Sequence, residues 1–212
     1  MPFQAQTKEN SVLQKPSEKA VFLNLPYDRQ FSNLCLAYVA GIACYGLTAR
    51  TTLEIPGGAR RLDRIVELIG SCKFSIHDLS RVQLDPRQPR TPRFNMPFEL
   101  GLTVAWQRFG NEHTWFVFEA AKFRILKSLS DLSGTDIYIH GGTVRGIFQQ
   151  LCHAFIDEEK QPSVREMMVV YRYLKSEMAN ILKASNAGSI FDGARPFRDV
   201  YLAAALKADK RV

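Results

Sequence analysis

The 212-residue sequence lacks the features that mark membrane, secreted and metal-binding proteins. No apolar run reaches the roughly 20 residues needed to span a bilayer, and residues 1–18 contain no apolar stretch typical of a secretory signal. The four cysteines form no CxxC pair, which argues against a zinc site and against a disulfide framework. They are Cys35, Cys44, Cys72 and Cys152. We therefore expect a cytoplasmic protein with reduced cysteines, no metal and no membrane partner.

The sequence also lacks a P-loop and a dinucleotide-binding fingerprint, since its glycine pairs at 57–58 and 141–142 are more typical of turns. The formal net charge is +7, but the basic residues are dispersed, so nucleic acid is not expected as a partner. Two clusters stand out, Arg60, Arg61 and Arg64, and the loop that carries Arg81, Arg87, Arg90 and Arg93. That loop fits an anionic small molecule, and it equally fits a loop that is merely solvated.

What is present is the composition of one globular domain with additions, 46% hydrophobic and 23% charged. Five short apolar segments read as strands, at residues 20–25, 47–54, 72–79, 114–120 and 136–140. Segments with helical spacing of apolar residues alternate with them. This alternation predicts a flavodoxin-like, doubly wound α/β fold with about five parallel strands in the order 2-1-3-4-5.

The two ends of the chain depart from this pattern. Residues 1–18 are polar and predict a flexible arm, with order from Ala20, and residues 19–161 form the predicted domain. Residues 162–212 predict a helical extension with helices at 164–182 and 196–207. We expect this extension to cover a face of the sheet or to mediate self-association, and hence a homo-oligomer.

In open parallel sheets, ligands bind beyond the carboxyl ends of the strands where the strand order reverses, here between the first and third strands. Asn24 and Tyr27 follow the first strand, and Asp78 and Ser80 end the third. The helix expected to begin near Pro97 starts from the same edge. Its polar residues are Asn95 and Glu99.

The two carboxylates allow simpler explanations. Glu99 near a helix start fits compensation of the helix dipole, and Asp78 two residues before Ser80 fits a turn. Together, however, two carboxylates that converge on one crevice are suited to orient a hydroxylated ligand and to stabilise a developing cation.

The segment SIHDLSR at 75–81, followed by PRFNMPFELGLTVAW at 92–106, resembles the nucleoside 2-deoxyribosyltransferase family. It is also similar to Toll/interleukin-1 receptor (TIR) domains and their bacterial relatives. The likeness covers about residues 20–155, and its specific motif is residues 76–105. Two departures concern the substrate: Phe94 to Phe98 stand where many TIR domains have Trp-Cys, and the first strand lacks a Gly-Pro.

The resemblance implies a hydrolase or transferase that acts on the N-glycosidic bond of a nucleoside, a nucleotide or NAD, with NAD as a possible substrate and no cofactor. Glu99 would be the nucleophile or cation-stabilising carboxylate, and Asp78 would hold the sugar hydroxyls. The implied substrate-binding residues are Asn24, Tyr27, Asn95, Ser80 and Arg93. A non-catalytic nucleotide sensor and a TIR-like protein-interaction module remain the alternatives.

Overall fold

The computed structural model describes residues 16–55, 60–81 and 93–210. Its five parallel strands form one sheet in the order β2-β1-β3-β4-β5, which confirms the predicted flavodoxin-like topology. The strands are β1 (Ser17–Asn24), β2 (Thr48–Arg50), β3 (Cys72–Asp78), β4 (Thr114–Glu119) and β5 (Ile137–Ile139). The first strand begins at Ser17, three residues before the predicted Ala20, although Ser17 to Lys19 are exposed.

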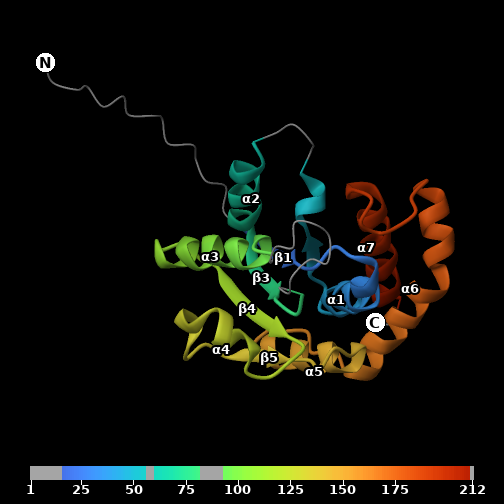
Figure 1. Cartoon of the computed structure of the whole chain (residues 1–212). Helices are drawn as coiled ribbons and strands as arrows, with labels where there is room; N and C mark the ends of the chain where they lie inside the picture. Colours follow the sequence, from blue (N-terminus) through green and yellow to red (C-terminus); the bar gives the residue numbers. More distant parts are fainter. Residues whose placement is uncertain (1–15, 56–59, 82–92, 211–212) are drawn as a thin grey trace, which may run out of the picture.

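Helices connect the strands and cover both faces of the sheet, as Figure 1 shows. They are α1 (Ser32–Cys44), α2 (Arg61–Gly70), α3 (Asn95–Arg108), α4 (Arg124–Ser128) and α5 (Val144–Ala154), with 3-10 turns η1 (Arg29–Phe31), η2 (Thr52–Glu54) and η3 (Ser130–Leu132). α2 and α3 lie on one face, and α1 lies on the other (Figure 1).

The predicted second strand is shorter than expected. Of residues 47–54, only Thr48–Arg50 pairs with β1, and Thr52–Glu54 forms the turn η2. The Glu54 carboxylate accepts a hydrogen bond from the Thr51 backbone N–H and pairs with Arg50 at 2.7 Å, so it stabilises the turn. β2 is an edge strand, where the sheet offers a longer segment a partner on one side only.

The main core lies between the sheet and α1. Ten consecutive residues of α1, Cys35 to Cys44, are buried. The sheet covers one side of α1, and the two C-terminal helices, α6 (Val164–Ala184) and α7 (Ala194–Asp209), cover the side that faces away from the sheet. Gly41 allows α5 to come close, since a side chain there would collide with Leu151. A smaller core on the opposite face packs α2 and α3 against β1 and β3.

The C-terminal extension forms α6 (Val164–Ala184) and α7 (Ala194–Asp209). Both pack mainly on α1, outside the sheet layer, in the region drawn in orange and red in Figure 1. Met167, Val170 and Phe197 are buried in the same core as β1 and β3. The extension therefore encloses α1, whereas the sequence predicted that it covers a face of the sheet or mediates self-association; the second alternative stays a prediction. Within the described residues, no helix is both long and apolar enough to cross a membrane.

Candidate functional site

The carboxyl ends of β1, β3 and β4 lie side by side at one edge of the sheet. Asn24 pairs in register with His77, and Asp78 pairs with Phe118. Alternate residues along a strand point to opposite faces, so the polar residues at this edge divide between two sides. Asn24 and His77 lie on the face covered by α2 and α3, and Asp78 lies on the face covered by α1.

Glu99 lies on α3 and is only 7% exposed. Its carboxylate makes no hydrogen bond or ion pair with the described residues, and its oxygens still touch solvent. Burial raises the pKa of Glu99 to about 7, and the charge of Arg61 offsets part of this rise. α3 begins at Asn95, so Glu99 belongs to the second turn, where compensation of the helix dipole has largely faded. The helix dipole therefore gives no sufficient reason for a carboxylate at this position.

Three hydroxyl groups lie on the loops after β1 and β2, those of Tyr27, Thr51 and Thr52, and the Tyr27 hydroxyl is close enough to Glu99 to be affected by its charge. The Tyr27 hydroxyl and Thr52 Oγ1 are 3.0 Å apart. Burial raises the pKa of Tyr27, the nearby Glu99 carboxylate raises it further, and the Thr52 and Thr51 hydroxyls act in the opposite direction. Thr51 Oγ1 is buried and makes no hydrogen bond of good geometry with the described residues, although it stands in the capping-box position that faces the Glu54 N–H at the start of η2. An unsatisfied hydroxyl and an unsatisfied carboxylate thus lie around the same tyrosine, which we call the Glu99 site (Tyr27, Thr51, Thr52, Arg61 and Glu99).

The C-terminal extension reaches this site through an aromatic contact and through the packing of α7 on η2. The rings of Tyr27 and Phe191 lie 5.6 Å apart, and Phe191 belongs to the segment between α6 and α7. The extension therefore helps to position Tyr27, although it adds no titratable group to the Glu99 site.

Asp78 is fully buried, and its carboxylate is well satisfied. It accepts hydrogen bonds from the Tyr38 hydroxyl of α1 at 2.7 Å and from the Ser80 backbone N–H at 2.9 Å. His140 Nε2 lies 3.2 Å away. The Gly142 N–H donates to His140 Nδ1, so Nε2 is the donor of the ring, and its hydrogen-bond partner is Ser80 Oγ at 3.0 Å. The bond from Ser80 is the turn predicted as the simpler explanation of Asp78.

A second buried carboxylate extends this group. Glu119, at the end of β4, accepts hydrogen bonds from the Ala120 N–H and from the Arg124 side chain. Arg124 also donates to the Ser80 carbonyl at 2.7 Å, and Ser80 Oγ accepts from the Ala120 N–H. We call the connected group the Asp78 network (Tyr38, Asp78, Ser80, Glu119, Arg124 and His140). It ties together the loops after β3, β4 and β5.

The Asn24 side chain connects β1 to the start of α3. Its amide donates to the Met96 carbonyl and to His77 Nδ1, both at 2.9 Å. Asn24 is 3% exposed, so its amide fixes α3, and with it Glu99, against the sheet.

From His77 a chain of hydrogen bonds continues along β3. Because Nδ1 accepts, His77 Nε2 donates to Ser75 Oγ at 3.0 Å. His113 Nδ1 donates to the Cys72 carbonyl, so Ser75 donates to His113 Nε2. Burial lowers the pKa of His77 to about 3, and the nearby His113 contributes. Both rings are therefore neutral structural groups at neutral pH.

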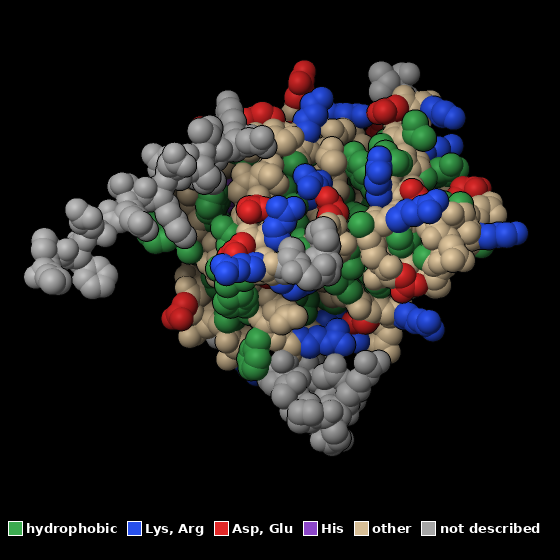
Figure 2. Space-filling view, turned by 90° about the horizontal axis from the view of Figure 1, so that it is seen from above, with side chains coloured by type: hydrophobic (Ala, Val, Ile, Leu, Met, Phe, Trp, Pro, Cys, Tyr) green, Lys and Arg blue, Asp and Glu red, His purple; other side chains and the backbone are tan. Residues whose placement is uncertain are grey.

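Two arginines at the ends of the predicted anion-binding loop pair with Asp28. Arg81 Nε and Arg93 Nη1 each lie 3.2 Å from Asp28 Oδ2. Asp28 Oδ1 also caps η1 by accepting from the Phe31 N–H. Arg87 and Arg90 lie outside the described residues, so phosphate recognition by this loop stays a prediction. The face shown in Figure 2 carries scattered basic side chains with acidic ones among them.

The structure brings together only some of the predicted site residues. Tyr27 and Glu99 lie in the Glu99 site, Asp78 and Ser80 lie in the Asp78 network, and Asn95 is exposed at the start of α3. The described contacts do not join Asp78 to Glu99. The expected crevice with two converging carboxylates therefore stays a prediction.

The sequence prediction missed several members of these groups, namely Tyr38, Thr51, Thr52, Arg61, Glu119, Arg124 and His140. A usable signal existed for Thr51 and Thr52, because they directly follow β2 at the ligand-binding edge. The predicted strand extended to Glu54, so Thr51 and Thr52 were assigned to the strand and not to the loop that follows it. No group of three or more His, Cys, Asp or Glu side chains in the described parts of the chain could hold a metal ion.

Comparisons of the chain with models of known protein families, with curated proteins and with solved structures gave no match.

Proposed function

We propose that the chain binds a nucleoside, a nucleotide or NAD at the Glu99 site, and that Glu99 acts on the N-glycosidic bond of this ligand. The observation that carries the proposal is the state of Glu99, which is 7% exposed and has no hydrogen bond or ion pair within the described residues. A largely buried carboxylate without a hydrogen-bond partner in the protein is unfavourable, and the nearby charge of Arg61 offsets part of that cost. Such costs concentrate at functional sites, where a ligand supplies the missing partner.

The chemistry follows from charge. When the bond between C1′ of the sugar and the base nitrogen breaks, the base leaves with the electron pair and the sugar becomes a cation. An ionised carboxylate in a medium of low dielectric constant stabilises that cation strongly. In a hydrolase, water then adds to C1′ and gives a proton to Glu99. In a transferase, a second base adds in place of water.

The raised pKa suits both steps. With a pKa of about 7, Glu99 is partly ionised at neutral pH and also able to hold a proton after water attack. A positively charged leaving group, such as the nicotinamide of NAD, would lower this pKa and favour the ionised form before the bond breaks.

The neighbouring hydroxyls support a hydroxylated ligand. Thr51 Oγ1 has no partner within the described residues, and a sugar hydroxyl would satisfy it. The resemblance of residues 75–81 and 92–106 to deoxyribosyltransferases and TIR domains supports the same ligand class. In this proposal Asp78 has a structural role at the ends of β3, β4 and β5, because its own oxygens are already engaged by Tyr38 and Ser80.

The test is a direct search for released base. Purified protein is incubated with NAD, and separately with deoxynucleosides plus free bases, and the products are separated by chromatography. Glu99→Gln should lower the rate by about 10²–10³-fold, because it keeps the size of the side chain and loses the charge. Glu112→Gln, at an exposed position, is the matched control and should keep full activity. Unchanged release by the Glu99 variant would contradict the assignment.

A nucleotide sensor is the second candidate, and the engagement of Asp78 favours it. A second free carboxylate to orient the ligand is not found among the described residues at this edge. A rise in melting temperature with a nucleotide, without released base, would favour the sensor.

A further inference from the structure

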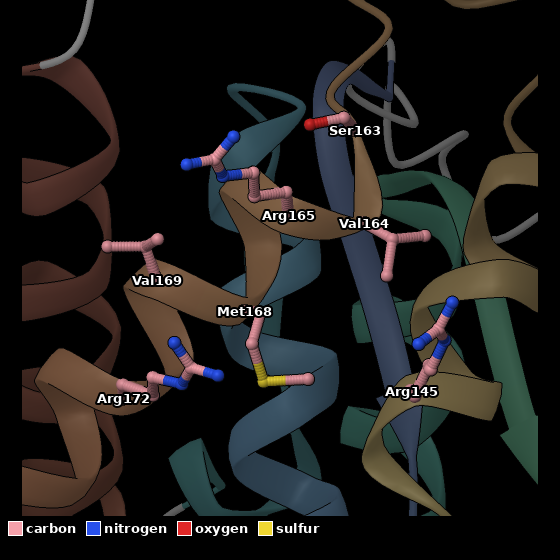
Figure 3. Close-up of a pocket in the computed structure, with 7 residues that line it drawn as sticks. All are labelled: Arg145, Ser163, Val164, Arg165, Met168, Val169 and Arg172. Atoms are coloured by element: carbon pink, nitrogen blue, oxygen red, sulfur yellow. The ribbon is translucent and has the colours of Figure 1, made fainter.

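A second pocket lies away from the Glu99 site, on α5 and the first turns of α6. Its volume is about 680 Å³. Arg145 of α5 lies on one side, and Arg165 and Arg172 of α6 lie on the other, around Met168 (Figure 3). Val164 and Val169 complete an apolar lining. Residues 165, 168, 169 and 172 recur at helical spacing, so they share one face of α6.

The three arginines leave a concentrated positive charge at this pocket. None of them forms an ion pair or a side-chain hydrogen bond with the described residues. The nearest acidic residue in sequence, Glu166, is engaged at the start of α6, where it accepts from the Ser163 N–H at 2.7 Å. An apolar lining with arginines at its rim fits a partner segment that combines an apolar side chain with carboxylates.

The chain itself carries such a segment. Ile156, in the connection from α5 to α6, is 66% exposed, and the next three residues are Asp157, Glu158 and Glu159. Asp157 and Glu159 are exposed and form no ion pair within the described residues. We call residues 156–159 the acidic connection.

The acidic connection is held in a defined shape beside the pocket. The Gln161 side chain donates to the carbonyls of Phe155, Ile156 and Glu158, which closes the connection into a compact turn. Pro162 then leads directly to Ser163, which lines the pocket. Charges of opposite sign therefore lie on adjacent surfaces of one molecule without pairing with each other.

We propose that the arginine pocket binds the acidic connection of a second copy of this chain, in a two-fold symmetric dimer. Ile156 of one copy packs on Met168 and Val169 of the other, and Asp157 and Glu159 face Arg165 and Arg172. Because the acidic connection leads through Pro162 into Ser163 at the pocket, one two-fold axis lets each copy supply a pocket and a connection. The contact between pocket and acidic connection thus forms twice in the dimer, and no further copy can add to form a larger assembly through it.

This dimer is independent of the Glu99 site. It has to overcome the net charge of +7 on each copy, which repels a second copy over long range. Salt screens that repulsion over roughly 8–10 Å near physiological ionic strength, whereas close pairs at the interface are screened less. The test should therefore be made near physiological ionic strength.

The decisive experiment is a charge exchange, followed by sedimentation or light scattering over a range of concentrations. One variant carries Arg165→Glu and Arg172→Glu, and the other carries Asp157→Arg and Glu159→Arg. Each variant alone should be monomeric, because like charges meet at both contacts. An equal mixture should form a heterodimer, because each contact again joins opposite charges. Arg195→Glu with Arg198→Glu on α7 is the matched control and should dimerise like the parent.

Circular dichroism of each variant checks that the fold is retained. The proposal is overturned if the parent stays monomeric at about 0.1 mM, where a dimer with a Kd of about 0.1 mM would contain half of the chains. It is also overturned if a mixture of the two folded variants stays monomeric. Binding of a polyanion that depends on Arg165 and Arg172 in a monomeric parent would assign the pocket to a different partner.

Discussion

Asp78 and Glu99 are two carboxylates near the same edge of one sheet, and the protein treats them in opposite ways. Asp78 accepts hydrogen bonds from Tyr38 and Ser80, and His140 Nε2 lies 3.2 Å from it. Glu99 lies on α3 and has no such partner within the described residues. Asp78 is 0% exposed and Glu99 is 7% exposed. Similar burial therefore accompanies very different electrostatic states.

The difference separates a structural role from a functional one. A buried charge that accepts from well-placed donors holds its surroundings in place, and its donors would be left unsatisfied without it. A buried charge without donors stabilises nothing in the free protein and is explained by something that binds there. The state of the hydrogen-bond partners, more than burial, identifies Glu99 as the candidate for chemistry.

The largest expected effect comes from removing the satisfied carboxylate. Asp78→Ala should lower the free energy of unfolding by about 3–5 kcal/mol, because it leaves the Tyr38 hydroxyl and the Ser80 N–H without their acceptor. Urea unfolding at pH 7.5, followed by circular dichroism, measures the change. A loss below about 1 kcal/mol would show that the network does not depend on Asp78.

The unsatisfied carboxylate should give a change of opposite sign. Burial raises the pKa of Glu99 from an ordinary value of 4.5 to about 7. Between these values the folded protein binds more protons than the unfolded chain, so the contribution of Glu99 to stability falls as the pH rises, and the cost is full above pH 7. Glu99→Gln should therefore raise the unfolding free energy by about 2–3 kcal/mol at pH 8 and by little at pH 4.5.

The comparison must be made between parent and variant at each pH. His77, with a pKa lowered to about 3, gives the folded protein fewer bound protons than the unfolded chain, so its contribution rises with pH up to about 6.5. In the parent, the pH dependence of stability caused by His77 opposes the one caused by Glu99. Because His77 is present in both the parent and Glu99→Gln, its effect cancels when their unfolding free energies are subtracted at the same pH. Equal stabilities of parent and variant at pH 8 would show that Glu99 has a compensating partner.

The fold was more predictable from sequence than the site. Strands β1, β3 and β4 are short apolar runs between segments of helical periodicity, so local signals identify them, and the regular alternation of strands and helices then indicates the doubly wound strand order. The site depends on contacts between distant residues. Tyr38 and Asp78 are 40 positions apart, and Ser80 and His140 are 60 apart. Periodicity within a segment carries no information on such pairs, so the sequence could name Asp78 but could not show that its oxygens are engaged.

The smallest expected effect comes from removing a single hydroxyl, that of Thr51 in the Glu99 site or that of Tyr38 in the Asp78 network. Thr51 Oγ1 is buried without a partner among the described residues, so Thr51→Val, which keeps the shape, should leave stability unchanged or raise it by up to about 1 kcal/mol. Tyr38→Phe is the matched control, since it removes a hydroxyl that donates to Asp78, and it should cost about 1–2 kcal/mol. If Thr51 serves a ligand, its variant should also lose most of the ligand-induced rise in melting temperature. A clear loss of stability in Thr51→Val would mean that this hydroxyl is satisfied in the free protein, and the distinction between the two sides would then rest on Glu99 alone.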